Sequence, residues 1–345
     1  MKTLTSRTMW GSILVGIVGL LATAAICSVF GSEKIFFSRV WQGMFGPTGS
    51  GFNQDYIIYV QFRLPRIFLA GIVGAALACA GTVLQAILRN PLADPYLLGV
   101  SSGAGLGTML AVIGGFGVTI WGTSAITLMS FICALGTVWI VWLLGGRGQK
   151  GGMTGLLLAG AVVNAFLSAV IMFLNSIAQA SQIQTTLFWL MGNISAMDNM
   201  FLLWISAGLV AAGVITCMRF SVWLNLISFS PEEARLAGVN VRWLYQGCFA
   251  VSALITAVAV SLSGLVGFVG LIVPHGVRLL IGPDHRLLIP VSALAGAAFV
   301  IVADTVSRMV VSPAVMPVGV VTALAGGPFF LYLLVRFGRK LHLGD

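Results

Sequence analysis

The chain has 345 residues, of which 59% are hydrophobic and only 8% are charged. A water-soluble domain carries about 25% charged residues, so this composition excludes a chain that faces water on all sides. The net charge of +9 comes from basic residues scattered among predicted loops, which is typical of membrane proteins and not of a nucleic-acid-binding stripe. Only helices or closed barrels can span hydrocarbon, and the long, continuous apolar runs favour helices. We therefore predict an all-α, polytopic membrane protein.

About ten long apolar segments follow one another along the chain, separated by clusters of charged residues, proline and glycine. We predict membrane-spanning helices at 9–30, 63–88, 93–113, 119–143, 155–175, 199–218, 243–263, 265–281, 287–311 and 317–337. The first segment follows Lys2 and Arg7 and is longer than the apolar core of a usual signal peptide, which favours a retained span. We expect a single transmembrane domain over residues 1–345.

The distribution of basic residues predicts how the chain is oriented. If the N-terminus is cytoplasmic, 13 of the 18 lysines and arginines lie on the cytoplasmic side. The five on the outer side are Lys34, Arg39, Arg63, Arg66 and Arg308. Because cytoplasmic loops carry an excess of basic residues, this arrangement predicts that both termini are cytoplasmic.

Two arginines oppose this trend at the outer end of the second predicted span. Arg63 and Arg66 lie three residues apart on one helical face, and Pro65 suits a first helical turn. They indicate either a docking site for an acidic partner or snorkelling to lipid phosphates. Arg308 has Asp304 one turn earlier, and an ion pair between them would neutralise both charges. A docking role requires Arg308 to project beyond Asp304, and the sequence leaves these alternatives open.

A cytoplasmic loop at 88–95 contains two prolines, which restrict the preceding residues, Asn90 and Asp94, to extended backbone. The next stretch, 99–105, is rich in glycine, alanine and serine. Such a span suits close helix packing or a water-lined path, and we favour packing.

The cytoplasmic stretch 228–238 carries the signals of a short, bounded helix. Ser230 fits the N-cap, Pro231 fits the first helical position, and Glu233 completes a capping box at the third. Gly238 suits the residue after the C-cap. A capped helix between two spans on the cytoplasmic side indicates either a connecting turn or a power-transmitting contact.

The sequence lacks the motifs of several kinds of functional site. No lysine follows a glycine, so the chain lacks a Walker A loop and we expect it to bind no nucleotide. The five cysteines lie in apolar runs without a Cys-x-x-Cys spacing, and we expect neither a disulfide framework nor a metal site from His275, His285 and His342. The buried carboxylates and histidines of a proton-coupled carrier are also missing, and we expect no catalytic residue.

Several motifs, taken together, resemble those of one transporter family. They are Arg63-Leu-Pro-Arg66, Gly74-Ala-Ala-Leu-Ala, Gln85 with Arg89-Asn-Pro-Leu-Ala-Asp-Pro95, Leu98-Gly-Val-Ser101, Leu156-Leu-Leu-Ala-Gly160, Gly267-Phe-Val-Gly-Leu-Ile-Val-Pro-His275, Asp284-His-Arg286 and Pro317-Val-Gly-Val-Val-Thr322. On these residues the chain resembles the permease family of bacterial ABC importers for ferric siderophores, haem and cobalamin, often called the FecCD-type family. The likeness runs from about residue 60 to the C-terminus.

The resemblance implies a type II ABC importer permease fold with ten membrane-spanning helices, embedded in the lipid of the bacterial cytoplasmic (inner) membrane. It implies two cytoplasmic ATPase subunits that bind ATP-Mg, so this chain itself holds no cofactor. It also implies a second permease, for which we expect a homodimer, although the sequence leaves an unlike partner open. A periplasmic or lipid-anchored substrate-binding protein would deliver the substrate, and no nucleic acid is expected as a partner.

The resemblance also implies roles for individual residues. Arg63, Arg66 and Arg308 match positions where the family's permeases meet acidic residues of the binding protein. The expected ATPase-coupling residues, within a segment at about 219–242, are Ser230, Pro231, Glu232, Glu233, Arg235, Leu236 and Gly238. The expected inner-gate residues are Asn90, Leu92, Met153 and Thr154. The chain departs from the family pattern at Met316, where glutamate is common, and at Met153-Thr154, where Thr-Ser is common.

These observations predict a permease that moves a bulky metal chelate by alternating access, powered by a separate ATPase. Iron-siderophore or haem is the leading substrate class, and cobalamin is the alternative. The rival classes are an ion-coupled secondary carrier, which the missing buried charges disfavour, and a membrane enzyme or scaffold, which the missing catalytic groups disfavour.

Overall fold

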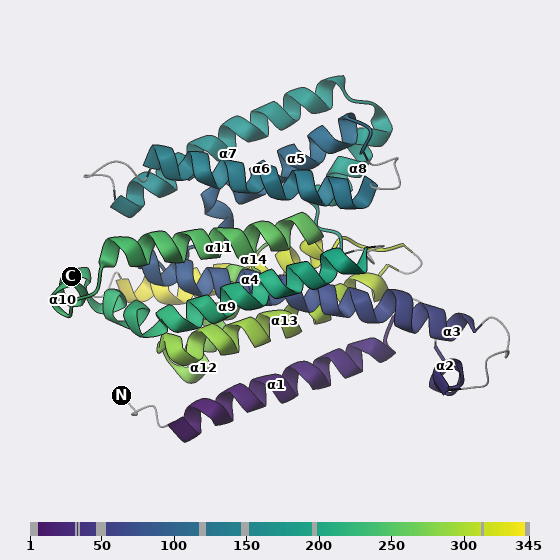
Figure 1. Cartoon of the computed structure of the whole chain (residues 1–345), viewed down its shortest axis with the longest axis horizontal. Helices are drawn as coiled ribbons and strands as arrows, with labels where there is room; N and C mark the ends of the chain where they lie inside the picture. The colour runs from purple at the N-terminus through teal and green to yellow at the C-terminus, as the bar shows by residue number, and fades with distance from the viewer. Residues whose placement is uncertain are drawn as a thin grey trace.

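The computed structural model describes residues 6–31, 33, 35–45, 53–116, 122–145, 152–194, 199–311 and 314–341, and the regular structure in these ranges is helical. The apolar helices are α1 (Ser6–Val29), α4 (Leu64–Ile87), α5 (Val100–Ile113), α6 (Gly122–Gly145), α7 (Gly152–Ile177), α9 (Met200–Phe229), α11 (Val241–Ser263), α12 (Val269–Ile281), α13 (His285–Met309) and α14 (Val318–Leu341) (Figure 1). Seven are long enough to cross a membrane, and α5, α12 and α14 are shorter apolar helices. They coincide with the ten predicted spans, which confirms the all-α, polytopic prediction.

Short helices connect these spans, and the sequence predicted only one of them. They are α2 (Phe37–Phe45), α3 (Gln54–Ile57), a π-helical stretch (Ile58–Arg63) that continues into α4, the 3-10 helix η2 (Pro95–Leu98), α8 (Ala180–Leu190) and the predicted helix, α10 (Pro231–Leu236). The span predicted to end at residue 218 also continues, as α9, to Phe229. The prediction stopped there because Arg219 interrupts the apolar sequence. A helix can continue beyond the hydrocarbon into water, and α9 continues past Arg219.

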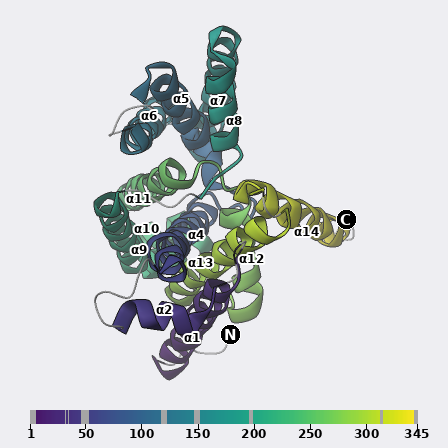
Figure 2. The same ribbon diagram turned by 90° about the vertical axis from the view of Figure 1, so that its right-hand side faces the viewer.

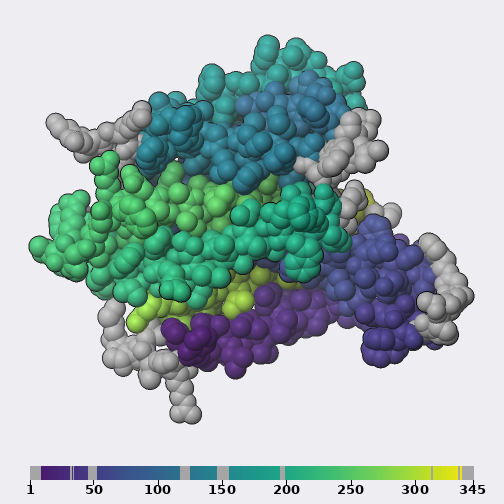
Figure 3. Space-filling model, in the orientation of Figure 1, coloured from purple at the N-terminus to yellow at the C-terminus, as the bar shows by residue number. Residues whose placement is uncertain are grey.

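The helices form two layers and one peripheral helix. We call α5, α6, α7 and α8 the upper layer, and α4, α9, α11, α12, α13 and α14 the main bundle (Figures 1 and 2). α1 packs against α13 on the side of the main bundle away from the upper layer. Figure 3 shows the upper layer seated over α11, with α1 along the opposite edge.

α4 is the central helix of the main bundle. In the most apolar part of its span 83% of the residues are buried, against 11% in α1. A side chain at Gly74 would overlap the carbonyl oxygen of Gly296 in α13, and one at Gly81 would overlap that of Gly270 in α12. Lipid provides no hydrophobic drive between helices, so close backbone approach at small residues is what favours their association.

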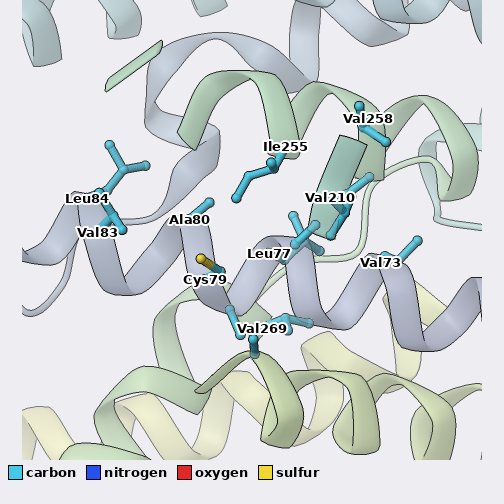
Figure 4. Close-up of a cluster of buried hydrophobic side chains, with 14 of the residues drawn as sticks. Val73, Leu77, Cys79, Ala80, Val83, Leu84, Val210, Ile255, Val258 and Val269 are labelled. Atoms are coloured by element: carbon cyan, nitrogen blue, oxygen red, sulfur yellow. The ribbon is translucent and has the colours of Figure 1, made fainter. Parts of the chain in front are cut away.

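Apolar side chains fill the space around this central helix. Figure 4 shows α4, with Leu77 and Leu84, lying between Ile255 of α11 and Val269 of α12. Leu77, Leu84, Ile255 and Val269 are all buried. These buried contacts hold α4 between α11 and α12.

The two ends of the bundle carry different short helices. α1 begins, α14 ends and α10 lies at one end, which we call the inner end (Figure 1). α2 and α3 lie at the opposite end, which we call the outer end. This arrangement is the one expected if both termini face the same side of a membrane.

Candidate functional site

A buried ion-pair cluster joins α4 to α13 at the outer end. The Nε and Nη2 atoms of Arg66 donate to both carboxylate oxygens of Asp304 at 2.8–3.1 Å. Arg308 Nε lies 3.1 Å from the same carboxylate, which confirms the i,i+4 ion pair predicted from the sequence. Asp304 is only 1% exposed. A charge removed from water at such a position costs several kcal/mol unless it is paired, which accounts for the two arginines around it.

Arg63 makes a different kind of contact. Its guanidinium donates to the carbonyl oxygens of Ser28 and Val29 at 3.0 Å and of Glu33 at 2.9 Å. The last carbonyls of a helix have no partner within the helix, and a cation there also complements the helix dipole. Arg63 therefore caps the end of α1 and ties it to α4, and Gly31 leaves the space that the guanidinium fills.

These contacts occupy the three arginines that we predicted to dock a binding protein. Arg63 and Arg308 are buried, and the Arg66 side chain is 17% exposed. Arg308 folds back to bond Asp304 and Thr305 instead of projecting beyond them. The geometry accords with the ion-pair alternative, and docking at these residues stays a prediction.

The loop of the predicted inner gate is a compact turn at the inner end of α4. The Asn90 side chain accepts from the Leu92 backbone amide at 2.9 Å, and the Asn90 amide donates to the Gln85 carbonyl. Arg89 has a positive φ of 50°, which is unusual for a residue other than glycine and turns the chain sharply. Leu92 is 44% exposed. The side chains of Met153 and Thr154, at the start of α7, lie outside the described part of the structure.

A proline inside α12 explains a buried polar chain beside this loop. Pro274 has no amide hydrogen, so the Gly270 carbonyl loses its helical partner. The Gln85 amide of α4 donates to the carbonyls of Gly270 and Leu271, at 3.2 and 3.3 Å. Arg278 in turn donates to the Gln85 side-chain oxygen at 3.1 Å. Gln85 thus satisfies the Gly270 carbonyl that the proline leaves open and holds α12 against α4.

α10 is bounded by specific caps at both ends. The Ser230 hydroxyl accepts from the amides of Glu232 and Glu233, as predicted. The prediction of a capping box was wrong. In a capping box the Glu233 side chain would accept from the Ser230 backbone amide, but that amide donates to the Leu226 carbonyl at the end of α9. Gly238, with φ of 84°, and Val239 complete the C-terminal cap by donating to carbonyls inside the helix.

This helix presents an apolar side chain to its surroundings at the inner end. Leu236 is 89% exposed, and Glu232, Glu233 and Arg235 are exposed around it, whereas Ala234 packs inward. Phe229, just before the helix, is also exposed. Leu236 and Phe229 are therefore two large apolar side chains that lie exposed near charged groups, beyond the end of the spans.

A polar contact fixes the end of α9, directly before α10, to the start of α13. The Asn225 amide donates to Asp284 at 2.9 Å, and its oxygen accepts from the His285 backbone amide at 2.9 Å. His285 Nδ1 lies 2.7 Å from the same oxygen, so Nδ1 carries the proton. Partial burial acts to raise the pKa of Asp284, but hydrogen bonds from Arg286 and Asn225 outweigh it and hold that pKa at about 2. Asn225 was not among the site residues predicted from the sequence; the available signal was the one side-chain amide in a largely apolar helix.

Metal-binding side chains do not gather in the described ranges. No group of three or more His, Cys, Asp or Glu side chains there could hold a metal ion. Four of the five cysteines are buried and the fifth, Cys133, is half-buried, all as free thiols. They pack as small hydrophobic side chains, as we expected.

The described part of the chain thus contains ten apolar helices, with the glycine-packed α4 among them, paired charges at one end and the capped helix α10 at the other. This architecture is that of a membrane-embedded transport permease. The chain belongs to the FecCD transport family, whose family model matches residues 17–336.

Relatives across bacteria and archaea support this assignment. The chain is 38% identical to the hemin transport system permease protein HmuU of Yersinia pestis, over 96% of both chains. It is 41% identical to the cobalamin import system permease protein BtuC of Halobacterium salinarum, over 81% of this chain and 73% of the relative. A solved structure described as a metal-chelate type ABC transporter, in an inward-facing conformation, matches with a TM-score of 0.80 at 30% identity, over 94% of this chain and 98% of that one.

Proposed function

We propose that this chain is the permease subunit of an ABC importer that carries an iron-siderophore or haem across the bacterial cytoplasmic membrane. The family assignment and the similarity to a metal-chelate type transporter support the transport class. Relatives named for hemin and for siderophore transport support the substrate class. The observation that carries the proposal is α10, a rigidly capped helix that exposes Leu236 at the inner end.

The power for transport comes from two cytoplasmic ATPase subunits, one against α10 of each permease in a homodimer. Leu236 enters an apolar pocket of the ATPase, and the charged groups of Glu232, Glu233 and Arg235 surround that contact. A helix fixed by caps at both ends moves as one body, so it can pass a displacement on to α9. The Asn225 contact then carries the displacement to α13.

Alternating access follows from this coupling. A binding protein outside delivers the chelate near the outer arginine cluster, and closure of the ATPases opens the inner gate at Asn90 and Leu92. Both termini are cytoplasmic in this arrangement, because α10, the start of α1 and the end of α14 share the inner end. This chain binds no ATP-Mg itself; the ATPase subunits do.

Transport by the reconstituted complex tests the substrate class. The chain is placed in liposomes with its ATPase and binding protein, and uptake of haem, a ferric siderophore and cobalamin is measured with and without ATP. We expect ATP-dependent uptake of haem or the siderophore. Uptake of cobalamin alone would favour the second candidate, which the relative at 41% identity supports. Uptake that needs an ion gradient but no ATPase would overturn the proposal.

A matched pair of leucine variants tests the role of α10. Leu236→Ala should weaken the affinity for the ATPase about tenfold or more, the loss found when an interface side chain that fills a pocket at the centre of the contact is truncated. The control is Leu158→Ala, at a residue that is 68% exposed on the α7 span. Affinity is measured by titrating the ATPase onto the permease in nanodiscs, and equal affinity for both variants would contradict the proposed contact.

A further inference from the structure

The predicted inner gate lies where the chain passes between the two layers. α4 of the main bundle ends at Ile87, and α5 of the upper layer begins at Val100. The segment between them, 88–99, carries the exposed Leu92 and the helix η2. We call 88–99 the gate segment. Its position means that any movement of the gate is also a movement at the joint between the layers (Figures 1 and 2).

The side chain of Tyr96 attaches the gate segment to the main bundle. Its hydroxyl donates to the Val266 carbonyl at 2.9 Å and accepts from the Val266 amide at 3.0 Å. Val266 is buried in the non-helical crossing 264–268, between α11 and α12. Non-helical backbone at membrane depth needs partners supplied by the protein. One hydroxyl here satisfies both backbone groups of a residue that has no helical partner.

The backbone around Tyr96 attaches the same segment to the upper layer. The Tyr96 carbonyl accepts from the Asn164 side-chain amide of α7 at 3.3 Å. The oxygen of that amide accepts from the Ser102 hydroxyl of α5 at 2.5 Å. Because the Tyr96 carbonyl can only accept, it fixes how the amide is turned. A side chain at Gly160 of α7 would overlap the Leu97 carbonyl, so η2 packs directly on the α7 backbone. Tyr96 therefore has one contact on each side of the joint.

We infer that Tyr96 is a positioning residue of the inner gate, which links the gate segment to the 264–268 crossing and to α7 at the same time. The inference rests on the proposed function, because it takes Asn90 and Leu92 as the gate. If the gate opens while both contacts hold, the crossing and α7 have to move with it. Without the hydroxyl the gate segment loses its two hydrogen bonds to the crossing but keeps its contact with α7. Gate opening is then no longer tied to movement of the crossing, and less substrate is imported for each ATP hydrolysed.

The test is Tyr96→Phe in the complete transporter, with import per ATP hydrolysed as the measurement. Phenylalanine keeps the ring and removes only the hydroxyl. We expect import per ATP to fall about tenfold, the effect of leaving a buried donor and acceptor unpaired. The rate of ATP hydrolysis should stay within about twofold, a change typical of a site outside the nucleotide machinery. The matched control is Tyr59→Phe, which removes a hydroxyl that bonds Ser28 at the outer end.

A second readout follows the gate directly. Leu92→Cys is labelled with a water-soluble thiol reagent, once alone and once combined with Tyr96→Phe, and the parent chain gives the background from its buried or half-buried cysteines. We expect faster labelling when the hydroxyl is absent. Asn164→Ala removes the opposite contact and should also lower import per ATP. The double variant of Tyr96→Phe with Asn164→Ala should be no worse than the more affected single variant, since both act through one segment.

The outcomes separate this inference from the proposed function. If the unaltered complex imports no chelate with ATP, the proposed function fails. If it imports, but Tyr96→Phe changes neither import per ATP nor Leu92→Cys labelling, the inference fails. A Tyr96→Phe variant that is only less stable, with an unchanged ratio of import to ATP hydrolysed, also overturns it, because the residue is then structural and nothing more.

Discussion

Replacing Arg66 by glutamine separates a structural role of the outer arginines from docking. Arg66 bonds both oxygens of Asp304, which is 1% exposed, while Arg308 bonds the same carboxylate from its other side. Removing one partner of a buried ion pair costs about 3–5 kcal/mol. Because Arg308 remains in place, we expect the lower end of that range, about 3 kcal/mol, for Arg66→Gln. Folded proteins are stable by only about 5–15 kcal/mol, so this loss is large.

Thermal stability in detergent measures the effect. The fraction of monodisperse permease is followed by size-exclusion chromatography after heating, for the parent and each variant. The control is Arg286→Gln, which removes another bidentate contact, to Asp284, where the arginine side chain is 46% exposed. This pair is partly exposed, so its loss should cost less than the loss of the buried Arg66 pair, and the thermal midpoint should fall less than that of Arg66→Gln.

The opposite pattern would refute the structural role. If Arg66→Gln is as stable as the Arg286→Gln control but binds the substrate-binding protein more weakly, the Arg66–Asp304 pair contributes little to the fold. The arginine would then act in docking, as the family resemblance implies.

Three further predictions concern packing, capping and buried amides. Gly81→Ala should leave little monodisperse protein, because the new methyl group overlaps the Gly270 carbonyl, whereas Gly136→Ala, which meets no atom within 4 Å, should purify normally. Ser230→Ala should destabilise the first turn of α10 by about 1 kcal/mol, seen as faster hydrogen exchange of its amides than in the parent. Gln85→Leu leaves the Gly270 carbonyl unpaired and should cost about 1–3 kcal/mol, measured as a lower thermal midpoint; an unchanged midpoint would show that water replaces the amide.

The helices could be predicted because their signals are local. Hydrocarbon selects apolar runs of a given length, so the spans are visible in composition alone. α10 was predicted nearly residue by residue, since capping depends on side chains within a few positions of the helix ends. The error at Ser230 is instructive in the same terms. Ser230 ends α9 and begins α10, but it has only one backbone N–H. That N–H donates to the Leu226 carbonyl of α9, so it cannot bond the Glu233 side chain.

The partners of polar residues could not be predicted in this way. Sequence spacing offered Asp304 a partner four residues away, Arg308, and this pair is present. It could not offer Arg66, which is 238 positions away and makes the closer contact. The same holds for Asn225 with His285 and for Tyr96 with Val266, each joined by tertiary packing. Only the antiparallel placement of helices, which a single sequence does not specify, brings such residues together.

A polar side chain is unusual inside the membrane spans, and an exposed apolar side chain is unusual outside them. The two cases lead to different interpretations. Within the spans a buried charge or amide is costly unless it is paired, and Arg66 is bonded to Asp304 and Gln85 to the Gly270 carbonyl. A basic residue near the membrane is therefore weak support for an external partner, because the fold itself needs it. Outside the spans the costly group is an apolar one. Leu236 is exposed on a helix whose ends are already capped, and the contact with an ATPase subunit proposed above would cover it.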